Sequence, residues 1–232
     1  MSRAGSLPKA SFHREVEAKF LVRSRALHDA VAALKSLGEF RVMSRRREKQ
    51  SNTYFDTDDL ALKKSRSVLK LRLTDRKREV TFKSEMGHRR GVSDRRELTL
   101  PIRKSQVGRF LKELLDIEPV RCARAVAERK PLKKLFTLFT DRRITILGVG
   151  RQRVELDVDR VVVRQGRKRL EHREVELENL TASPKTFRRA IAVLRRRFGA
   201  RLRPSQIWKA EYGYRMASSV ARDTPYTPHG RD

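Results

Sequence analysis

The stretch HREVEAKFLV, residues His13–Val22, alternates charged and apolar side chains along most of its length. In a β-strand, residues i and i+2 lie on the same face, so Glu15, Glu17 and Lys19 are predicted to share one face. The apolar residues between them would lie on the opposite face. The same period of two recurs in five further stretches and predicts a strand in each. These stretches are Val68–Leu73, Glu79–Lys83, Arg95–Leu100, Arg153–Val163 and Arg173–Glu178.

Two shorter β-rich segments, Asn52–Phe55 and Arg142–Leu147, bring the number of predicted strands to about eight. Apolar residues at helical spacing predict three helices, over residues 27–37, 107–115 and 184–198. Ser183 followed by Pro184 is typical of a helix start, and Gly199 of a helix end. These elements together predict a mainly antiparallel α+β domain.

The polar faces of the predicted strands are almost entirely charged. Two strands place three carboxylates at positions i, i+2 and i+4, where neighbouring like charges repel one another. These residues are Glu155, Asp157 and Asp159 in one strand and Glu174, Glu176 and Glu178 in the other. Divalent cations would account for the placement, since hard oxygen ligands hold Mg²⁺ or Mn²⁺, and the Lys and Arg strands would suit phosphate oxygens. For any single strand, an ordinary sheet with a solvated polar face is the alternative.

The net charge points to a polyanionic partner without choosing one. The 232 residues include 57 Lys or Arg and 28 Asp or Glu, which gives a formal net charge of +29. Nucleic acid, an acidic membrane surface and phosphate chains would all suit this surplus, and an arginine-rich solvated surface is the alternative. No stretch approaches ~18 uninterrupted apolar residues, so no membrane span is expected. The single cysteine, Cys122, fits a reducing cytosol, so a cytoplasmic location is expected.

The motif EVEAK (Glu15–Lys19) opens an ordered series of motifs. It is followed by YFDT (Tyr54–Thr57), LKLRL (Leu69–Leu73), VTFK ending at Lys83, the R-x-E of Arg95 and Glu97, VELDVD (Val154–Asp159), EVELE (Glu174–Glu178) and Lys209. The series resembles the CYTH superfamily, the triphosphate tunnel metalloenzymes, in the family's order. EVEAK matches the family's ExExK signature, which is weak by itself, but the ordered series is specific. The resemblance covers about residues 12–216, with tails expected at 1–11 and 217–232. It implies an eight-stranded antiparallel β-tunnel, a closed barrel with a charged interior flanked by helices.

The resemblance also implies roles for individual residues, with two Mg²⁺ or Mn²⁺ ions. Glu15 and Glu17, with one or more of Glu174, Glu176 and Glu178, would hold a metal that orients the triphosphate. Glu97 and Asp157, again with a carboxylate of the EVELE strand, would serve a second, water-activating metal, and Glu155 completes the expected ligand set. Phosphate oxygens would be contacted by Lys19, Lys70, Arg72, Lys83, Arg95, Arg142 and Lys209. Glu97, Asp157 and Lys19 are the expected catalytic residues.

The leading functional hypothesis is metal-dependent hydrolysis of inorganic triphosphate or short polyphosphate. Thiamine triphosphatases and class IV adenylyl cyclases are related enzymes, so an organic triphosphate stays open as substrate. A non-catalytic polyphosphate-binding module is the alternative, because Thr99 stands where a second glutamate often follows R-x-E. Nucleic acid is the least favoured partner, since no helix-turn-helix, RRM or KH pattern is present. The sequence also allows a homodimer.

Three further features have simpler interpretations. The run Arg45–Lys49 is expected to be a solvated loop. Arg195–Arg197 would form the wet side of a helix, with docking of phosphate chains as the alternative. Trp208 and Tyr212 are expected to pack on the outer face, with stacking on a base as the alternative.

Overall fold

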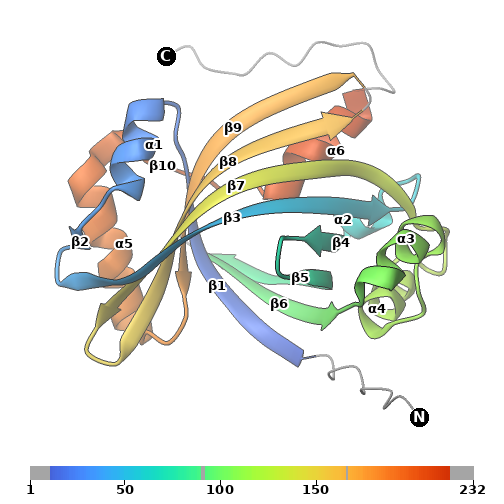
Figure 1. Ribbon diagram of the computed structural model, residues 1–232, viewed down its shortest axis with the longest axis horizontal. Helices are drawn as coiled ribbons and strands as arrows, with labels where there is room; N and C mark the ends of the chain where they lie inside the picture. The colour runs from blue at the N-terminus through green and yellow to red at the C-terminus, as the bar shows by residue number, and fades with distance from the viewer. Residues whose placement is uncertain (1–10, 90–91, 166, 220–232) are drawn as a thin grey trace.

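A closed β-barrel forms the centre of the computed structural model, which describes residues 11–89, 92–165 and 167–219 (Figure 1). Eight described strands pair antiparallel in the order β1–β6–β5–β4–β3–β7–β8–β9, and β9 pairs with β1 to close the ring. Their bounds are β1 Ser11–Leu21, β3 Phe40–Asp56, β4 Ser67–Leu73, β5 Arg78–Arg89, β6 Val92–Pro101, β7 Lys133–Val149, β8 Gln152–Gln165 and β9 Lys168–Asn179. The predicted eight-stranded antiparallel barrel is therefore confirmed. Residues 1–10 and 220–232 of the predicted tails lie outside the described residues.

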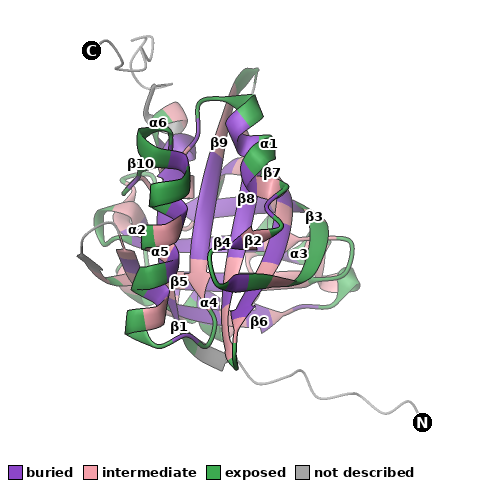
Figure 2. Ribbon diagram, turned by 90° about the vertical axis from the view of Figure 1, so that its left-hand side faces the viewer, coloured by how far each residue is buried: buried purple, intermediate pink, exposed green. Residues whose placement is uncertain are grey.

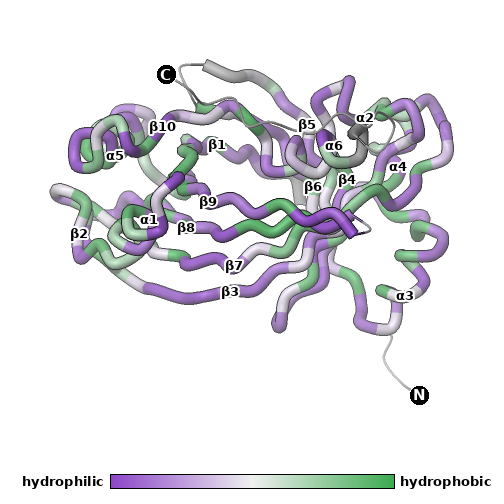
Figure 3. Tube along the Cα trace, turned by 90° about the horizontal axis from the view of Figure 1, so that it is seen from above, coloured by the Kyte–Doolittle hydropathy of each residue, from purple (hydrophilic) through white to green (hydrophobic). Residues whose placement is uncertain are grey.

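Helices flank the two ends of the strands (Figures 1 and 3). At one end lie α1 (Arg25–Ala32) and α5 (Pro184–Phe198), and toward the other lie α2 (Ala61–Lys64), α3 (Lys104–Glu113), α4 (Glu118–Val126) and α6 (Lys209–Ser219). Short strands β2 (Ser36–Leu37) and β10 (Arg203–Pro204) pair with β3 and β1, and a 3₁₀ turn, η1 (Gly199–Arg201), follows α5. None of the described helices is long and apolar enough to cross a membrane.

The apolar faces of most strands point outward, onto the helices. Helices α1 and α5 cover Ala18, Phe20 and Val158 in one buried cluster, whereas Leu69 and Val80 pack with α2, α3 and α4 in a second. Burial runs along the central strands, and the exposed surface gathers on the helices and on the outer half of β3 (Figure 2). Because the apolar faces are used outside, the charged faces must line the interior.

Helix α6 closes part of the barrel interior with an apolar layer. Val161 and Val163 continue the face of Asp157 and Asp159 along β8, and they pack with α6. The interior face of the barrel therefore changes from charged to apolar along the same strands. Phe136 of β7 stacks on Tyr54 at 5.0 Å between ring centroids and meets Tyr214 of α6 edge-on at 5.2 Å.

The predicted helices differ from the observed ones mainly at their ends. The helix over 184–198 is confirmed: the Ser183 side chain accepts from the Thr186 N–H, and Gly199 has a φ of 60°. The helix expected over 27–37 ends at Ala32, because residues 36–37 pair with β3 instead. The helix expected over 107–115 spans 104–113. Helices α2, α4 and α6 were not predicted.

The prediction of a loop at Arg45–Lys49 was wrong. These residues belong to the 17-residue strand β3 and pair with β7 through Arg45↔Thr145 to Lys49↔Asp141. All five residues are charged and their side chains are mostly exposed, so no apolar residues alternate with polar ones in this segment. Backbone pairing to β7 holds this part of the strand, and hydropathy does not reveal such pairing.

Replacement of Gly213 tests the seating of α6. A Cβ at Gly213 would lie 2.1 Å from Cε2 of Phe136, so Gly213→Ala is expected to lower the free energy of unfolding by about 1–3 kcal/mol through overpacking. Gly108→Ala in α3 is the control, because its Cβ would meet nothing within 4 Å and a helical alanine is favoured over glycine by up to ~1 kcal/mol. Denaturant unfolding measures both, and equal changes would contradict the tight packing of α6.

Candidate functional site

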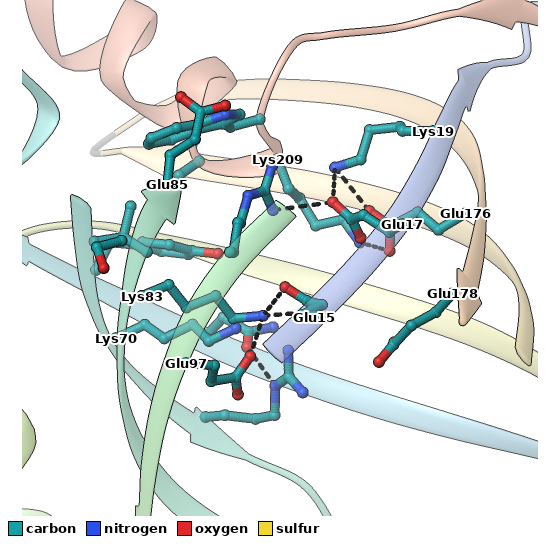
Figure 4. A pocket seen from close by; sticks show the side chains of 18 of the residues that line it. Glu15, Glu17, Lys19, Lys70, Lys83, Glu85, Glu97, Glu176, Glu178 and Lys209 are labelled. Carbon is teal, nitrogen blue, oxygen red and sulfur yellow. Dashed lines mark hydrogen bonds and ion pairs between the residues drawn. The ribbon is translucent and has the colours of Figure 1, made fainter. Parts of the chain in front are cut away.

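The barrel encloses a cavity of about 210 Å³ with walls of both charge signs (Figure 4). Eight cationic side chains line it: Lys19, Arg66, Lys70, Arg72, Lys83, Arg95, Arg142 and Lys209. Seven carboxylates line it as well: Glu15, Glu17, Glu85, Glu97, Glu155, Glu176 and Glu178. The lining is thus nearly balanced in charge, in contrast to the whole chain.

Lys83 of β5 binds carboxylates of β6 and β1. Its Nζ lies 2.8 Å from both oxygens of Glu15 and also pairs with Glu97 (Figure 4). Burial disfavours the charged amine, but Glu15 and Glu97 outweigh it and raise the pKa of Lys83. The same contact holds the pKa of Glu97 below its ordinary value despite burial. Both carboxylates of this wall are therefore ionised and already paired with a cation.

Lys70 of β4 is a buried amine without an anionic partner. It is 4% exposed, lines the cavity, and makes no ion pair or hydrogen bond to the described part of the chain. Burial, with the nearby charges of Arg72 and Lys83, lowers its pKa well below the ordinary value. An anion entering the cavity would supply the missing partner.

Two arginines complete the cationic wall. Nε of Arg72 donates to Oδ1 of Asn52 at 2.9 Å, which orients its guanidinium beside Lys70. Arg95 of β6 donates to Glu17 at 2.9 Å, and its guanidinium lies 5.2 Å from the centre of the Trp208 ring. The Nε of Arg95 is buried and has no hydrogen-bond partner among the described residues. The cationic wall thus keeps donors available for phosphate oxygens.

Asp159 anchors two cations beneath the cavity. Arg142 of β7 donates to both of its oxygens, at 2.9 and 2.7 Å, and Lys209 of α6 contacts Oδ2. Lys209 also lies 2.7 Å from Glu174 and 3.2 Å from Glu176. Asp159 and Glu174 are fully buried. Despite burial, Lys209 and Lys19 lower the pKa of Glu174 to about 2.

Lys19 belongs to the same buried network. Its Nζ lies 2.7 Å from Glu176 and 3.9 Å from Glu17. Burial opposes the charge of Lys19, but Glu176 and Glu174 raise its pKa. Asp159, Glu174 and Glu176 place oxygens within 4.8 Å of one another, yet Arg142, Lys209 and Lys19 already neutralise them. This group does not fit a metal ion.

A second carboxylate group does fit a divalent cation. Oxygens of Glu155, Asp157 and Glu178 lie within 4.8 Å of one another. Oδ1 of Asp157 is buried without a hydrogen-bond partner, and Glu178 makes no ion pair within the described residues (Figure 4). Burial, followed by Glu15, raises the pKa of Glu178 to about 8. Arg142 pairs with the other oxygen of Asp157 and Arg46 lies 3.4 Å from Glu155, whereas Glu178 keeps a carboxylate without a cation among the described residues. Because hard cations take carboxylate oxygens, this acid-rich group suits Mg²⁺ or Mn²⁺.

The structure brings most predicted site residues to the cavity. Asp157 and Glu174 lie behind its wall, in contact with Arg142 and Lys209 respectively, and the other predicted residues line it. Among the described residues, the three-carboxylate groups contain neither Glu15, Glu17 nor Glu97. The expected grouping of Glu97 with Asp157 is not seen: Glu97 lies against Lys83, and Asp157 lies against Arg142.

Several cavity residues were missed by sequence reasoning. Gln50, Asn52 and Tyr54 line the cavity from β3, and their period of two was the available signal. Trp208 lines the cavity too, so the preferred prediction of outer-face packing was wrong for this residue, because the segment before α6 enters the barrel. Tyr212 is buried and stacks on His172 at 3.9 Å.

This fold and site define a β-tunnel with a mixed-charge interior. A sequence model of the CYTH domain matches residues 13–199, and the chain belongs to this family. Among curated proteins, none matches the chain at a significant level.

Solved structures share the fold at low sequence identity. A candidate adenylyl cyclase from Hippeastrum, described as having a dominant triphosphatase activity, is 19% identical with a TM-score of 0.64 over 86% of this chain and 96% of that one. A candidate adenylate cyclase from Bacillus halodurans is 22% identical with a TM-score of 0.62 over 87% and 97%. Protein PH1819 from Pyrococcus horikoshii is 14% identical with a TM-score of 0.50 over 86% and 99%. At these identities the likeness establishes the fold alone.

If tripolyphosphate binds in the cavity at a pH above the lowered pKa of Lys70, this amine is expected to take up a proton. An anion beside this amine would raise its lowered pKa, so binding would tighten as the pH falls toward that pKa. Calorimetry in buffers of different ionisation enthalpy measures the uptake. In Lys70→Arg the guanidinium stays charged throughout, so this contribution would disappear. Equal proton uptake by both proteins would contradict the assignment.

Removal of the Asp159 charge is expected to be costly. In Asp159→Asn, Arg142 and Lys209 lose a buried partner, and the free energy of unfolding should fall by about 3–5 kcal/mol. Glu171→Gln is the control, since Glu171 pairs with Arg160, Arg169 and Arg173 on the outer surface, where solvent screens the charges, and its loss should cost clearly less than that of Asp159. Similar losses in chemical denaturation would argue against a central role for Asp159.

Proposed function

We propose that this protein is a divalent-metal-dependent hydrolase of inorganic triphosphate or a related short phosphate chain. The observation that supports this is the division of the cavity between two walls. Donors of β4, β5 and β6 face the cavity from one side, and the Glu155, Asp157 and Glu178 group lies on β8 and β9. In the barrel of eight, β4 and β9 are four strands apart and therefore opposite. A triphosphate between the walls would meet donors on one side and a cation site on the other.

The chain's own residues would bind and orient the substrate. Lys70, Arg72 and Arg95 would hold phosphate oxygens. Lys83, which pairs with Glu15 and Glu97, would also contact the phosphate oxygens. Fixed donors cost little reorganisation when charge develops on the transferred phosphoryl group. Glu178 and Glu155 would hold a cation at the opposite wall. No serine, cysteine or histidine nucleophile is required for transfer to water.

A divalent cation would be held by Glu155, Asp157 and Glu178. When bound, it supplies Lewis acidity that offsets charge on phosphoryl oxygens and helps to deprotonate the attacking water. The expectation of two ions stays a prediction, as does the choice between Mg²⁺ and Mn²⁺. The described dominant triphosphatase activity of the Hippeastrum protein supports the same reaction class.

A polyphosphate-binding module without turnover is the second candidate. Thr99 donates to Oε1 of Glu97 at 2.8 Å, and Lys83 pairs with the other oxygen. The carboxylates of this wall within the described residues already have partners, so they do not offer a second cation site. If hydrolysis requires two cations, the protein would bind polyphosphate without hydrolysing it. Phosphate release separates the candidates, because the module would bind tripolyphosphate and leave it intact.

The test is phosphate release from tripolyphosphate with Mg²⁺ or Mn²⁺, with and without EDTA. Glu178→Gln should lower the rate by at least about 10²-fold, since it removes a charge at the proposed cation site. Glu171→Gln, on the outer surface of the same strand, should leave the rate unchanged. Thiamine triphosphate and ATP belong in the substrate panel because Trp208 lines the cavity. Turnover that survives both EDTA and Glu178→Gln would overturn the proposal.

A further inference from the structure

The excess positive charge of the chain lies outside the cavity, and one helix concentrates it. The cavity lining holds eight cations and seven acids, so it accounts for almost none of the net charge of +29. From Leu180 to Ala210 the sequence contains nine Lys or Arg and no Asp or Glu. Helix α5 lies within this segment.

The exposed side of α5 carries a row of cations along its axis. At 100° per residue, Lys185, Arg188, Arg189, Arg195 and Arg196 fall on one side, opposite the buried Phe187 and Leu194. We call these five residues the α5 cationic face. They span about 16 Å of helix at ~1.5 Å per residue. Figure 2 views the molecule from this side and shows the exposed turns of α5.

Most of the α5 cationic face has no partner in the fold. Arg189 pairs with Glu39 at 2.9 Å, but Lys185, Arg188, Arg195 and Arg196 make no ion pair to the described residues. Like charges three and four positions apart destabilise a helix, so the fold gains nothing from the arrangement. Some exposed arginines elsewhere, such as Arg109 and Arg160, do have carboxylate partners, whereas others, such as Arg41 and Arg151, are unpaired within the described part of the chain but do not lie in a row along one helix.

The cations continue from α5 to the cavity. Exposed Arg201 and Arg203 follow the helix, the Ser205 N–H donates to the Lys19 carbonyl at 2.9 Å, and Lys209 then lines the cavity. The segment thus leads from the α5 cationic face into the site that we propose for triphosphate. The face itself contains no aromatic or amide side chain, which nucleic-acid surfaces use to stack on or read bases.

From these observations we propose that the α5 cationic face binds long-chain inorganic polyphosphate. Such a chain carries a negative charge on every unit and has no sequence, so a linear row of unpaired cations is sufficient to hold it. The chemistry of the ligand matches that of the cavity, and in this respect the inference rests on the proposed function. The face would hold the chain close to the protein and raise its local concentration at the cavity.

The test compares Arg188→Gln/Arg195→Gln/Arg196→Gln with the control Arg109→Gln/Arg121→Gln/Arg160→Gln, which removes the same charge from ion-paired arginines. Binding of end-labelled long-chain polyphosphate is measured over a range of salt concentrations. The α5 variant should bind at least about 10-fold more weakly, and its log K against log[salt] slope should fall by about 2–3, since each lost phosphate contact removes ~0.7–0.9. The control should retain wild-type binding, and both variants should hydrolyse tripolyphosphate at the wild-type rate.

Two results would overturn the inference. Equal weakening in the control would assign binding to overall charge, and an equal or larger loss of duplex DNA binding in the α5 variant would assign the face to nucleic acid. The two proposals fail separately. If the wild-type protein binds long-chain polyphosphate but does not hydrolyse tripolyphosphate, and the α5 variant loses that binding, only the proposed hydrolysis is contradicted.

Discussion

The buried ion pair between Arg142 and Asp159 determines how the rest of the tunnel is arranged. It joins β7 to β8 through two hydrogen bonds, and Lys209 brings the first turn of α6 to the same carboxylate. Charges this deep interact strongly, and each is costly to bury without a partner. With Asp159 occupied in this way, Glu174 and Glu176 complete the neutralisation of Arg142, Lys209 and Lys19.

A barrel with charge inside and apolar residues outside needs covering elements. Helices α1 and α5 cover one part of the outer surface, and α2, α3 and α4 cover another. Two hydrophobic clusters therefore lie between the outer surface of the barrel and the helices. Among the residues that the structure describes, the apolar part of the interior is the layer where α6 packs against Phe136. Stability of the inner face therefore depends on pairing between charges, and a site that keeps charges unpaired exists at the expense of that stability.

Sequence alternation predicted most of the strands because they carry apolar residues on one face, and the resemblance to the CYTH superfamily implied their closure into a barrel. Alternation failed at Arg45–Lys49, where both faces of β3 are polar and pairing with β7 defines the strand. The resemblance implied the cavity residues, but neither it nor the alternation gave their pairing. Lys209 contacts Asp159, which lies 50 positions earlier in the sequence. The register of β7 is needed to tell that Arg142, and not Arg143, points inward. Trp208 carried no periodic signal at all.

The distribution of unpaired groups distinguishes a binding site from a charged core. After the internal pairings of the described residues, Lys70 remains without an anion on β4 and Glu178 without a cation on β9, beside Glu155 and Asp157, which pair with Arg46 and Arg142. A barrel selected only for stability would bring these opposite charges together, as it does with Lys83 and Glu15. Instead they lie across the cavity from one another. An anion beside Lys70 on β4, together with a divalent cation at the carboxylates of β8 and β9, would neutralise both walls. Neither the anion nor the cation alone would do so.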